Sequence, residues 1–309
     1  MRLFFLLLIS AGIIYNAKGQ GCSDAGFCTA GSIKPSIKND SIRNSLGFTF
    51  SYAKGERGTT VITPQFEPQF KVSDRSMVQI KIPFVFIKGS IGSINGIGDV
   101  ILSYNYKLDS VLRNPVVLTI GTRIATGTSS YKNDSISMPM PYQVSLGTTD
   151  LILGARMELK KGFSLSIAYQ QPLANRNQNG FDSAAYKNLM KSNGLKADEN
   201  YFISSYLERK GDLLLRIDKL FTFKKGVISI GLLPIYHLGN DKARINKATT
   251  ITVENSKGLT LNANVGMYYK LNKKLELSAI AAAPVIVRQS RPDGLTRSFI
   301  FLPGLRYNL

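Results

Sequence analysis

Apolar residues occupy every second position through most of the chain after residue 45. Between residues 259 and 269, for example, Leu259, Leu261 and Val265 alternate with Thr260 and Asn262. A period of two predicts a β-strand with one apolar and one polar face. The pattern recurs in segments 46–52, 62–72, 78–86, 100–106, 116–124, 151–159, 163–169, 213–217, 228–236, 259–269, 275–285 and 299–309. We therefore predict an all-β chain of about twelve strands.

One of these segments is weaker than the others. Pro64 and Pro68 both fall on the apolar face of segment 62–72. Proline has no N–H to donate to a neighbouring strand, so we expect this strand to be bent or bulged.

The length of the strands favours a membrane protein. Segments such as 259–269 and 299–309 exceed ten residues, whereas strands in soluble proteins usually have about five or six. A tilted strand needs about 9–11 residues to cross a bilayer, and bacterial barrels have an even number of strands. We predict that residues 46–309 form a transmembrane antiparallel up-and-down β-barrel. A soluble β-sandwich, with shorter strands and loops of equal length, is the alternative.

The connections between the segments alternate in length. If the first strand starts in the periplasm, the periplasmic breaks are short and the outer breaks are long, as in bacterial barrels. The short breaks are 71–75, 107–114, 160–162, 224–226 and 272–274, and the long ones are 88–96, 127–141, 172–210 and 239–257. The outer breaks 54–58 and 289–295 are short exceptions. Residues 183–192 in the longest break could form a short helix, in a lid, a receptor-binding loop or an ordinary solvated loop.

The N-terminus predicts export. Arg2 precedes an apolar stretch from residue 3 to 15, and small or polar residues follow it. This is the layout of a signal peptide, which we place at residues 1–20. Residues 21–45 then form a periplasmic segment or a plug. Its Cys22 and Cys28 predict a local disulfide, with a lipid anchor on Cys22 as the alternative.

Composition supports the same picture. The chain has a mean hydropathy of -0.01 and no apolar run of helix-spanning length after the N-terminus, which excludes a helical membrane protein. The formal charge is +19, from 39 basic and 20 acidic residues. An exported chain seldom meets nucleic acid, and the basic residues are scattered. Anionic lipid headgroups of the outer membrane are therefore the expected partner of this charge.

Charged residues at the polar positions of the strands are expected to face the lumen. The candidates are Glu67, Lys71, Lys81, Asp99, Lys107, Arg123, Arg156, Glu158, Arg216, Asp218, Lys270, Glu276 and Arg306. In a narrow barrel, opposite charges can bridge the interior and close it. The same residues could instead line a basic pathway for anionic solutes. The sequence leaves both readings open.

Two features resemble known outer-membrane proteins. The last strand has Gly304, Tyr307 and Leu309 at the places where outer-membrane barrels carry the signal for the barrel-assembly machinery, although Leu replaces the usual terminal Phe. The segments GIGDVILSYNYKL (96–108) and TTDLILGARMEL (148–159) resemble the Gly-Asp- or Asp-led strands of transporter-like barrels, including the phenol-degradation-pathway and fatty-acid-transporter-like proteins of Gram-negative bacteria. The resemblance implies a barrel that passes small or hydrophobic solutes. It carries over no binding residue.

Signals for an enzyme are weak. His237 is the single histidine. Outer-membrane phospholipases use a His with a Ser two residues later, where this chain has Gly239. A structural role for His237, facing the lumen or the rim, is the main interpretation. No metal-binding cluster, phosphate loop or other cofactor motif is present in the sequence.

These observations predict an outer-membrane channel or transporter for small solutes, hydrophobic ones included. The first alternative is a closed structural barrel whose extracellular loops bind a partner. The second is an outer-membrane lipid hydrolase.

Overall fold

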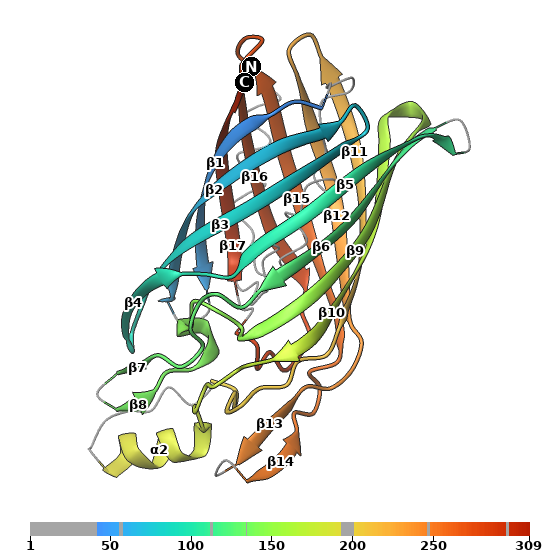
Figure 1. Ribbon diagram of the computed structural model, residues 1–309. Coiled ribbons are helices and arrows are strands. Elements are labelled where there is room, and N and C mark those ends of the chain that lie inside the picture. Colours follow the sequence, from blue (N-terminus) through green and yellow to red (C-terminus); the bar gives the residue numbers. More distant parts are fainter. Residues whose placement is uncertain are drawn as a thin grey trace, which may run out of the picture.

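The computed structural model describes residues 42–55, 58–111, 114–133, 135–192, 201–245, 248–294 and 297–309. The long strands form one antiparallel sheet that closes on itself (Figure 1). The predicted all-β barrel is confirmed, and the sandwich alternative is wrong because a sandwich needs two separate sheets. The signal peptide, Cys22, Cys28 and most of the 21–45 segment lie outside the described residues.

The barrel has twelve strand positions around its wall. Eleven are single strands, and one is shared by β4 and β5, which pair with successive halves of β3. The bounds are β1 Ser45–Gly55, β2 Thr60–Ser73, β3 Ser76–Gly89, β4 Gly92–Ile97, β5 Val100–Val111, β6 Asn114–Ile124, β9 Thr148–Leu159, β10 Phe163–Asn175, β11 Asp212–Phe223, β12 Gly226–His237, β15 Gly258–Lys270, β16 Leu275–Ile286 and β17 Arg297–Asn308. The ring closes where β1 pairs with β17, from Ser45 opposite Asn308 to Gly55 opposite Arg297.

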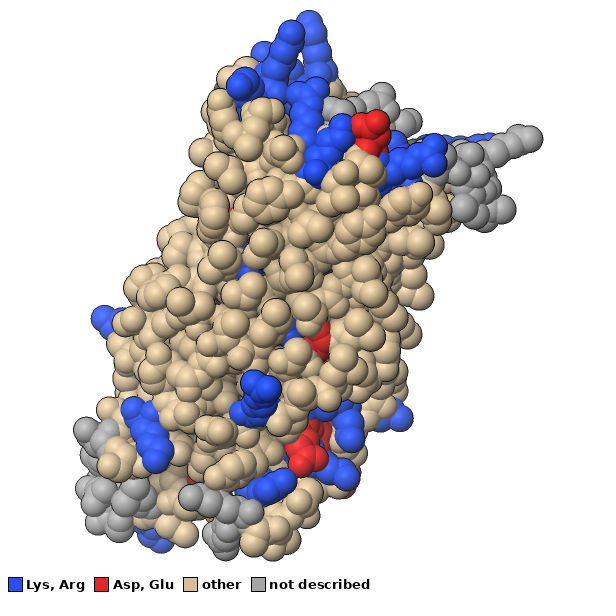
Figure 2. Space-filling model, viewed as in Figure 1, with Lys and Arg blue, Asp and Glu red and all other residues tan. Residues whose placement is uncertain are grey.

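Alternation along each strand gives the wall two different faces. On β3, Ile82, Phe84 and Phe86 are exposed on the outside, whereas Lys81 and Val85 are buried on the inside. This arrangement follows from the strand period of two. The middle of the visible outer wall therefore carries few charges (Figure 2).

The two ends of the barrel differ. All the turns of one end are short, and β1 begins and β17 ends there; we call this the short-turn end. One of these turns is the 3-10 helix η5 (Lys160–Gly162). The described parts of the connections 125–147, 176–211, 238–257 and 287–296 lie at the other end, the long-loop end. They contain β7 Lys132–Asn133, β8 Ile136–Ser137, η4 Met140–Tyr142, α2 Ser183–Ser192, β13 Lys242–Ile245 and β14 Thr249–Thr252.

The helix expected at 183–192 is confirmed as α2. No helix among the described residues is long and apolar enough to cross a membrane.

Three local predictions need correction. The break expected at 88–96 contains β4, which continues the hairpin with β3. The break expected at 107–114 is mostly strand, because β5 runs to Val111. The bulge expected at Pro64 and Pro68 is absent, since β2 keeps one register with β1 from end to end. On the β3 side the paired residues skip both prolines without a register shift there, because proline removes a donor but leaves the backbone extended.

Candidate functional site

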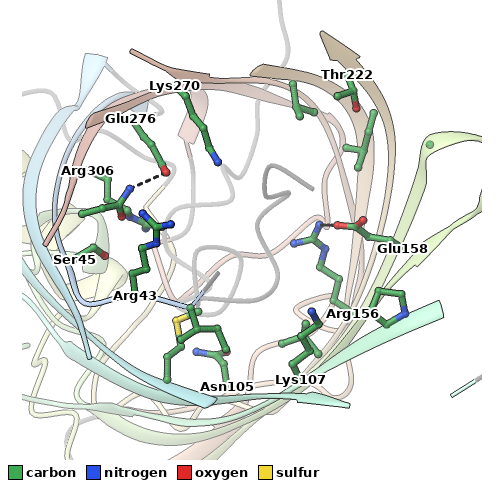
Figure 3. Close-up of a pocket in the computed structure, with 18 of the residues that line it drawn as sticks. Arg43, Ser45, Asn105, Lys107, Arg156, Glu158, Thr222, Lys270, Glu276 and Arg306 are labelled. Carbon is green, nitrogen blue, oxygen red and sulfur yellow. Dashed lines mark hydrogen bonds and ion pairs between the residues drawn. The ribbon is translucent and has the colours of Figure 1, made fainter. Parts of the chain in front are cut away.

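A cavity of about 1270 Å³ occupies the lumen at the short-turn end. We call it the vestibule. Its wall is built from the ends of the strands and from the short turns that join them, and side chains such as Arg156, Lys270 and Glu276 point into it (Figure 3). The strand period explains this for the strand residues, since inward-facing positions alternate with outward-facing ones along each strand.

The vestibule is strongly basic. Among the residues that the structure describes, eleven Lys and Arg line it against two acidic residues, Glu158 and Glu276. The basic residues are Arg43, Arg75, Lys107, Arg156, Lys160, Lys161, Lys224, Lys225, Lys270, Lys273 and Arg306. The same end of the molecule shows a concentration of Lys and Arg on its outer rim (Figure 2).

Both acidic residues of the vestibule have a polar partner. Glu158 accepts a hydrogen bond of 2.8 Å from Arg156, and Glu276 accepts one of 2.9 Å from the amide of Asn308. In the described part of the chain, Lys107 and Arg306 form no ion pair. The described lining of the cavity therefore carries many more basic than acidic groups.

Six of the expected lumen-facing residues line the vestibule: Lys107, Arg156, Glu158, Lys270, Glu276 and Arg306. Lys71 lies at the rim of the short-turn end instead, where its side chain is 40% exposed and pairs with Asp74. It does not line the cavity because β2 extends past the lumen at this point.

Further along the lumen, charged side chains pair along the wall. Arg216 binds Asp218 on the same strand at 2.6 Å and donates to Asn264 at 2.9 Å. Lys81 lies 3.7 Å from Glu67 on the neighbouring strand. All four charged groups are buried. The ion pairs expected to bridge the barrel thus connect residues of one strand or of adjacent strands, which are closer than residues on opposite walls.

Arg123 lies at the point where the two resembling segments meet. It forms an ion pair with Asp150, the aspartate of TTDLILGARMEL, and lies 4.0 Å from Asp99, the aspartate of GIGDVILSYNYKL. Asp99 also accepts a hydrogen bond of 3.3 Å from the backbone N–H of Leu146. The two aspartates therefore position one arginine and attach a long loop to the wall.

A second group of buried charges lies at the long-loop end. We call it the loop-end cluster, and it consists of Arg209, Asp212, His237, Asp241, Arg288 and Asp293. Its residues come from the ends of β11 and β12 and from three long loops. Arg209 binds Asp212 at 2.8 Å and Asp293 at 3.3 Å, and Arg288 also pairs with Asp293. The cluster joins the loops to the barrel.

His237 is held from both sides by carboxylates. Its Nδ1 lies 2.6 Å from Asp212 and its Nε2 lies 2.8 Å from Asp241. Two ionised carboxylates can only accept hydrogen bonds, so this geometry suits an imidazolium that donates twice. With His237 charged, the three basic and three acidic groups of the cluster balance. No ring nitrogen is left to take a proton from a serine, as a hydrolase would require.

The pKa values of loop residues in this cluster are shifted by neighbouring charges. Burial alone would lower the pKa of Arg209, but Asp212 and Asp293 raise it above its ordinary value. Burial alone would raise the pKa of the Asp293 carboxyl, but Arg288 and Arg209 hold it below its ordinary value. Both residues are therefore charged at neutral pH.

An aromatic cluster packs the loops together over the same end. Phe181 lies 5.4 Å from Tyr186 and 6.2 Å from Tyr201, measured between ring centres, and Tyr142 lies 6.1 Å from Tyr201. All four rings are buried. They join a core that includes Val85 and Ile87 of the wall. The long-loop end is therefore covered by packed loops.

Sequence reasoning missed several of these residues. Asp150 and Asp212 stand at strand ends, where a charged residue is equally typical of a loop. Arg209, Asp241, Arg288 and Asp293 lie in the loops, where no periodicity shows which side chain turns inward. A charged residue at the boundary of a strand, followed by strict alternation, is the signal that could have identified Asp150 and Asp212.

No family model matches this chain, and no curated protein matches it. Solved structures do. The COG4313 outer membrane channel from Pseudomonas putida F1 aligns with a TM-score of 0.60 and 12% identity, over 89% of this chain and 100% of that chain. The NanC porin gives a TM-score of 0.49 and 8% identity, over 85% of this chain and 100% of that one. The KdgM porin gives 0.44 and 10%, over 86% and 99%. The first of these likenesses shows that the fold is that of an outer-membrane barrel.

Proposed function

We propose that this chain is an outer-membrane channel for small polar solutes. The observation that carries the proposal is the closed barrel with an apolar outer wall, a polar lumen and a large vestibule at one end. An outer wall of this kind is stable in a bilayer, and a polar interior is the usual lining of an aqueous pore. The basic lining of the vestibule favours polar solutes over hydrophobic ones.

The same reasoning assigns location and orientation. Short turns face the periplasm in bacterial barrels, so the short-turn end faces the periplasm and the long loops face outward. We propose that the barrel-assembly machinery recognises β17, and that anionic lipids contact the basic rim. The Asp-led segments around Arg123 support a place among the transporter-like barrels. Fractionation of the outer membrane tests the location directly.

Conductance in planar bilayers and swelling of liposomes test the channel. Because packed loops cover the long-loop end, we expect a small conductance with closures, and slow entry of small sugars. A faster-migrating band of the unboiled protein on a gel would show that the sample is folded. Folded protein without conductance or swelling would contradict the proposal.

A closed barrel that binds a partner through its loops is the second candidate. The loop-end cluster and the aromatic cluster favour it, because both hold the loops over the lumen. Folded protein that conducts no ions, but whose loops are needed for binding at the cell surface, would support this candidate.

A lipid hydrolase is disfavoured by the contacts of His237. We expect the His237→Ala variant and the unchanged protein to hydrolyse outer-membrane phospholipid at the same low background rate. A hydrolysis rate that falls with this substitution would restore the enzyme as a candidate.

A further inference from the structure

The described residues around the vestibule include many more basic than acidic side chains. Four of its basic residues, Lys107, Arg156, Lys270 and Arg306, come from strands on different sides of the lumen and lie around the same space (Figure 3), and turn residues add further basic groups at its edge. Bringing like charges together costs free energy unless a counter-charge enters. The two acidic residues of the cavity supply part of that counter-charge, and both are bound by groups of the wall.

The cavity has the size of a solute site. Ligand pockets in proteins usually measure about 300–1,000 Å³, and the vestibule measures about 1270 Å³. It can hold a small solute together with water. Walls of low dielectric constant focus the field of the basic residues into this space, and salt at physiological concentration screens charges only beyond about 8 Å.

The arrangement suits an anion with more than one charged group. Figure 3 places Arg156 and Lys107 on one side of the cavity, and Arg306 and Lys270 on the other. Guanidinium groups bind carboxylate or phosphate oxygens in pairs, and ammonium groups bind them as point charges. One anionic group can therefore be bound at each side.

We propose that the vestibule binds small solutes with two or more carboxylate or phosphate groups, and that it makes the barrel anion-selective. The binding site stands on the cavity alone, whereas the selectivity rests on the proposed channel function. Anions entering from the periplasm, or arriving through the lumen, are concentrated at this end before they pass on.

The test compares two variants with equal loss of charge. Lys107→Gln/Lys224→Gln/Arg306→Gln removes three charges from the vestibule. Lys88→Gln/Lys187→Gln/Lys257→Gln removes three exposed charges at the long-loop end and leaves the cavity intact. Both are made in the full chain, and a heat-modifiable band confirms that each is folded. If the triple vestibule variant does not fold, Arg306→Gln alone replaces it.

The first measurement is the reversal potential in phosphatidylcholine bilayers under a KCl gradient. We expect the unchanged protein and the control variant to prefer chloride over potassium. The preference should fall by about tenfold in the vestibule variant, as expected for three partly screened charges. Equal permeability to both ions in the unchanged protein, with normal conductance, would overturn the selectivity while leaving the channel in place.

The second measurement is calorimetric titration of the folded protein in detergent with citrate, which carries three carboxylates. We expect binding that is weakened about tenfold in the vestibule variant and unchanged in the control. Such binding in a protein that conducts no ions would uphold the site and reject the channel. Absence of citrate binding, or equal loss in both variants, would overturn the site.

Discussion

At the scale of single residues, Arg123 shows how two distant segments make one site. Asp99 lies just before β5 and Asp150 lies in β9, 51 positions apart in the sequence, yet both face this arginine. All three charged groups are buried. A buried charge is tolerated when its partners remain, and removal of the central arginine deprives two buried carboxylates of their ion-pair partner.

We predict that Arg123→Met destabilises the folded barrel by about 3–5 kcal/mol. The chain has no Trp, so urea unfolding in lipid vesicles is best followed by the heat-modifiable gel shift. Arg123→Met/Asp150→Leu should recover part of the lost stability, because it also removes Asp150, one of the two carboxylates that lose their partner. A single variant that loses less than about 1 kcal/mol would show that the pair contributes little.

Asp293 gives a pH-dependent prediction. Its pKa is lowered in the folded protein by Arg288 and Arg209, so its ionised form stabilises loop closure above the unfolded pKa of about 3.9. That stabilisation is lost as the pH falls through the lower, folded value. We expect pepsin to cleave the long loops of the unchanged protein only well below pH about 4, and those of Asp293→Asn over its whole working range. Glu254→Gln, an exposed change in another loop, should behave like the unchanged protein.

At the scale of elements, the long loops are held by two independent contacts. One is the loop-end cluster, and the other is the aromatic cluster around Phe181. One loop junction also needs a glycine: Gly294 has a φ of 72°, and an added Cβ would lie 2.6 Å from the backbone of Met140. The loops therefore form a cover that a single substitution can loosen without altering the strands.

We predict that Phe181→Ala loosens this cover. Removal of a buried phenylalanine costs about 3–5 kcal/mol of packing, and Phe181 is 1% exposed. Trypsin should cleave the long loops of the variant faster, and its channels should stay open longer. The matched control is Leu173→Ala, because Leu173 is 67% exposed. If cleavage is unchanged while the gel shift is normal, the aromatic cluster is not what holds the loops.

At the scale of the whole molecule, the ring depends on its last strand. β17 pairs with β1 on one side and with β16 on the other. Without it, both neighbours would become free edges with unpaired N–H and C=O groups, which a bilayer does not tolerate. The small hairpin of β13 and β14 forms a separate sheet outside the ring.

We predict opposite results for two deletions of similar length. Removal of residues 297–309 should abolish the heat-modifiable band and leave aggregated protein. Removal of residues 242–252 should leave the band intact, because this hairpin contributes no strand to the ring. A heat-modifiable band in the first deletion would mean that the remaining eleven strand positions can form a closed barrel without β17.

The fold was largely predictable because each strand of a membrane barrel has to show apolar residues to lipid and polar residues to the lumen. That constraint repeats at every second position, so it is visible in local sequence for all twelve segments, and α2 was equally local. The boundaries were less visible. β4 carries Gly92, Ser93 and Gly96, whose small or polar side chains read as a loop, and only pairing with β3 makes it a strand.

The candidate site was predictable in part, for the same reason. Inward position follows from alternation, so Lys107, Lys270 and Arg306 could be proposed for the lumen from sequence alone. Which of these residues lie at the same level of the lumen could not be predicted, because that depends on how far each strand is shifted relative to its neighbours. The turn residues Lys160, Lys161, Lys224 and Lys225 looked like ordinary solvated turns, and the structure places them around one cavity.

The sequence by itself determined the barrel, the approximate number of its strands, the face on which each residue lies and which end carries the long loops. These properties depend on the strand period and on the length of connections, both of which are local. Only the tertiary structure decided which charges meet. Arg123 with its two aspartates, His237 between Asp212 and Asp241, and the basic vestibule all join residues far apart in the chain, because closure of the ring and folding of the loops bring them together.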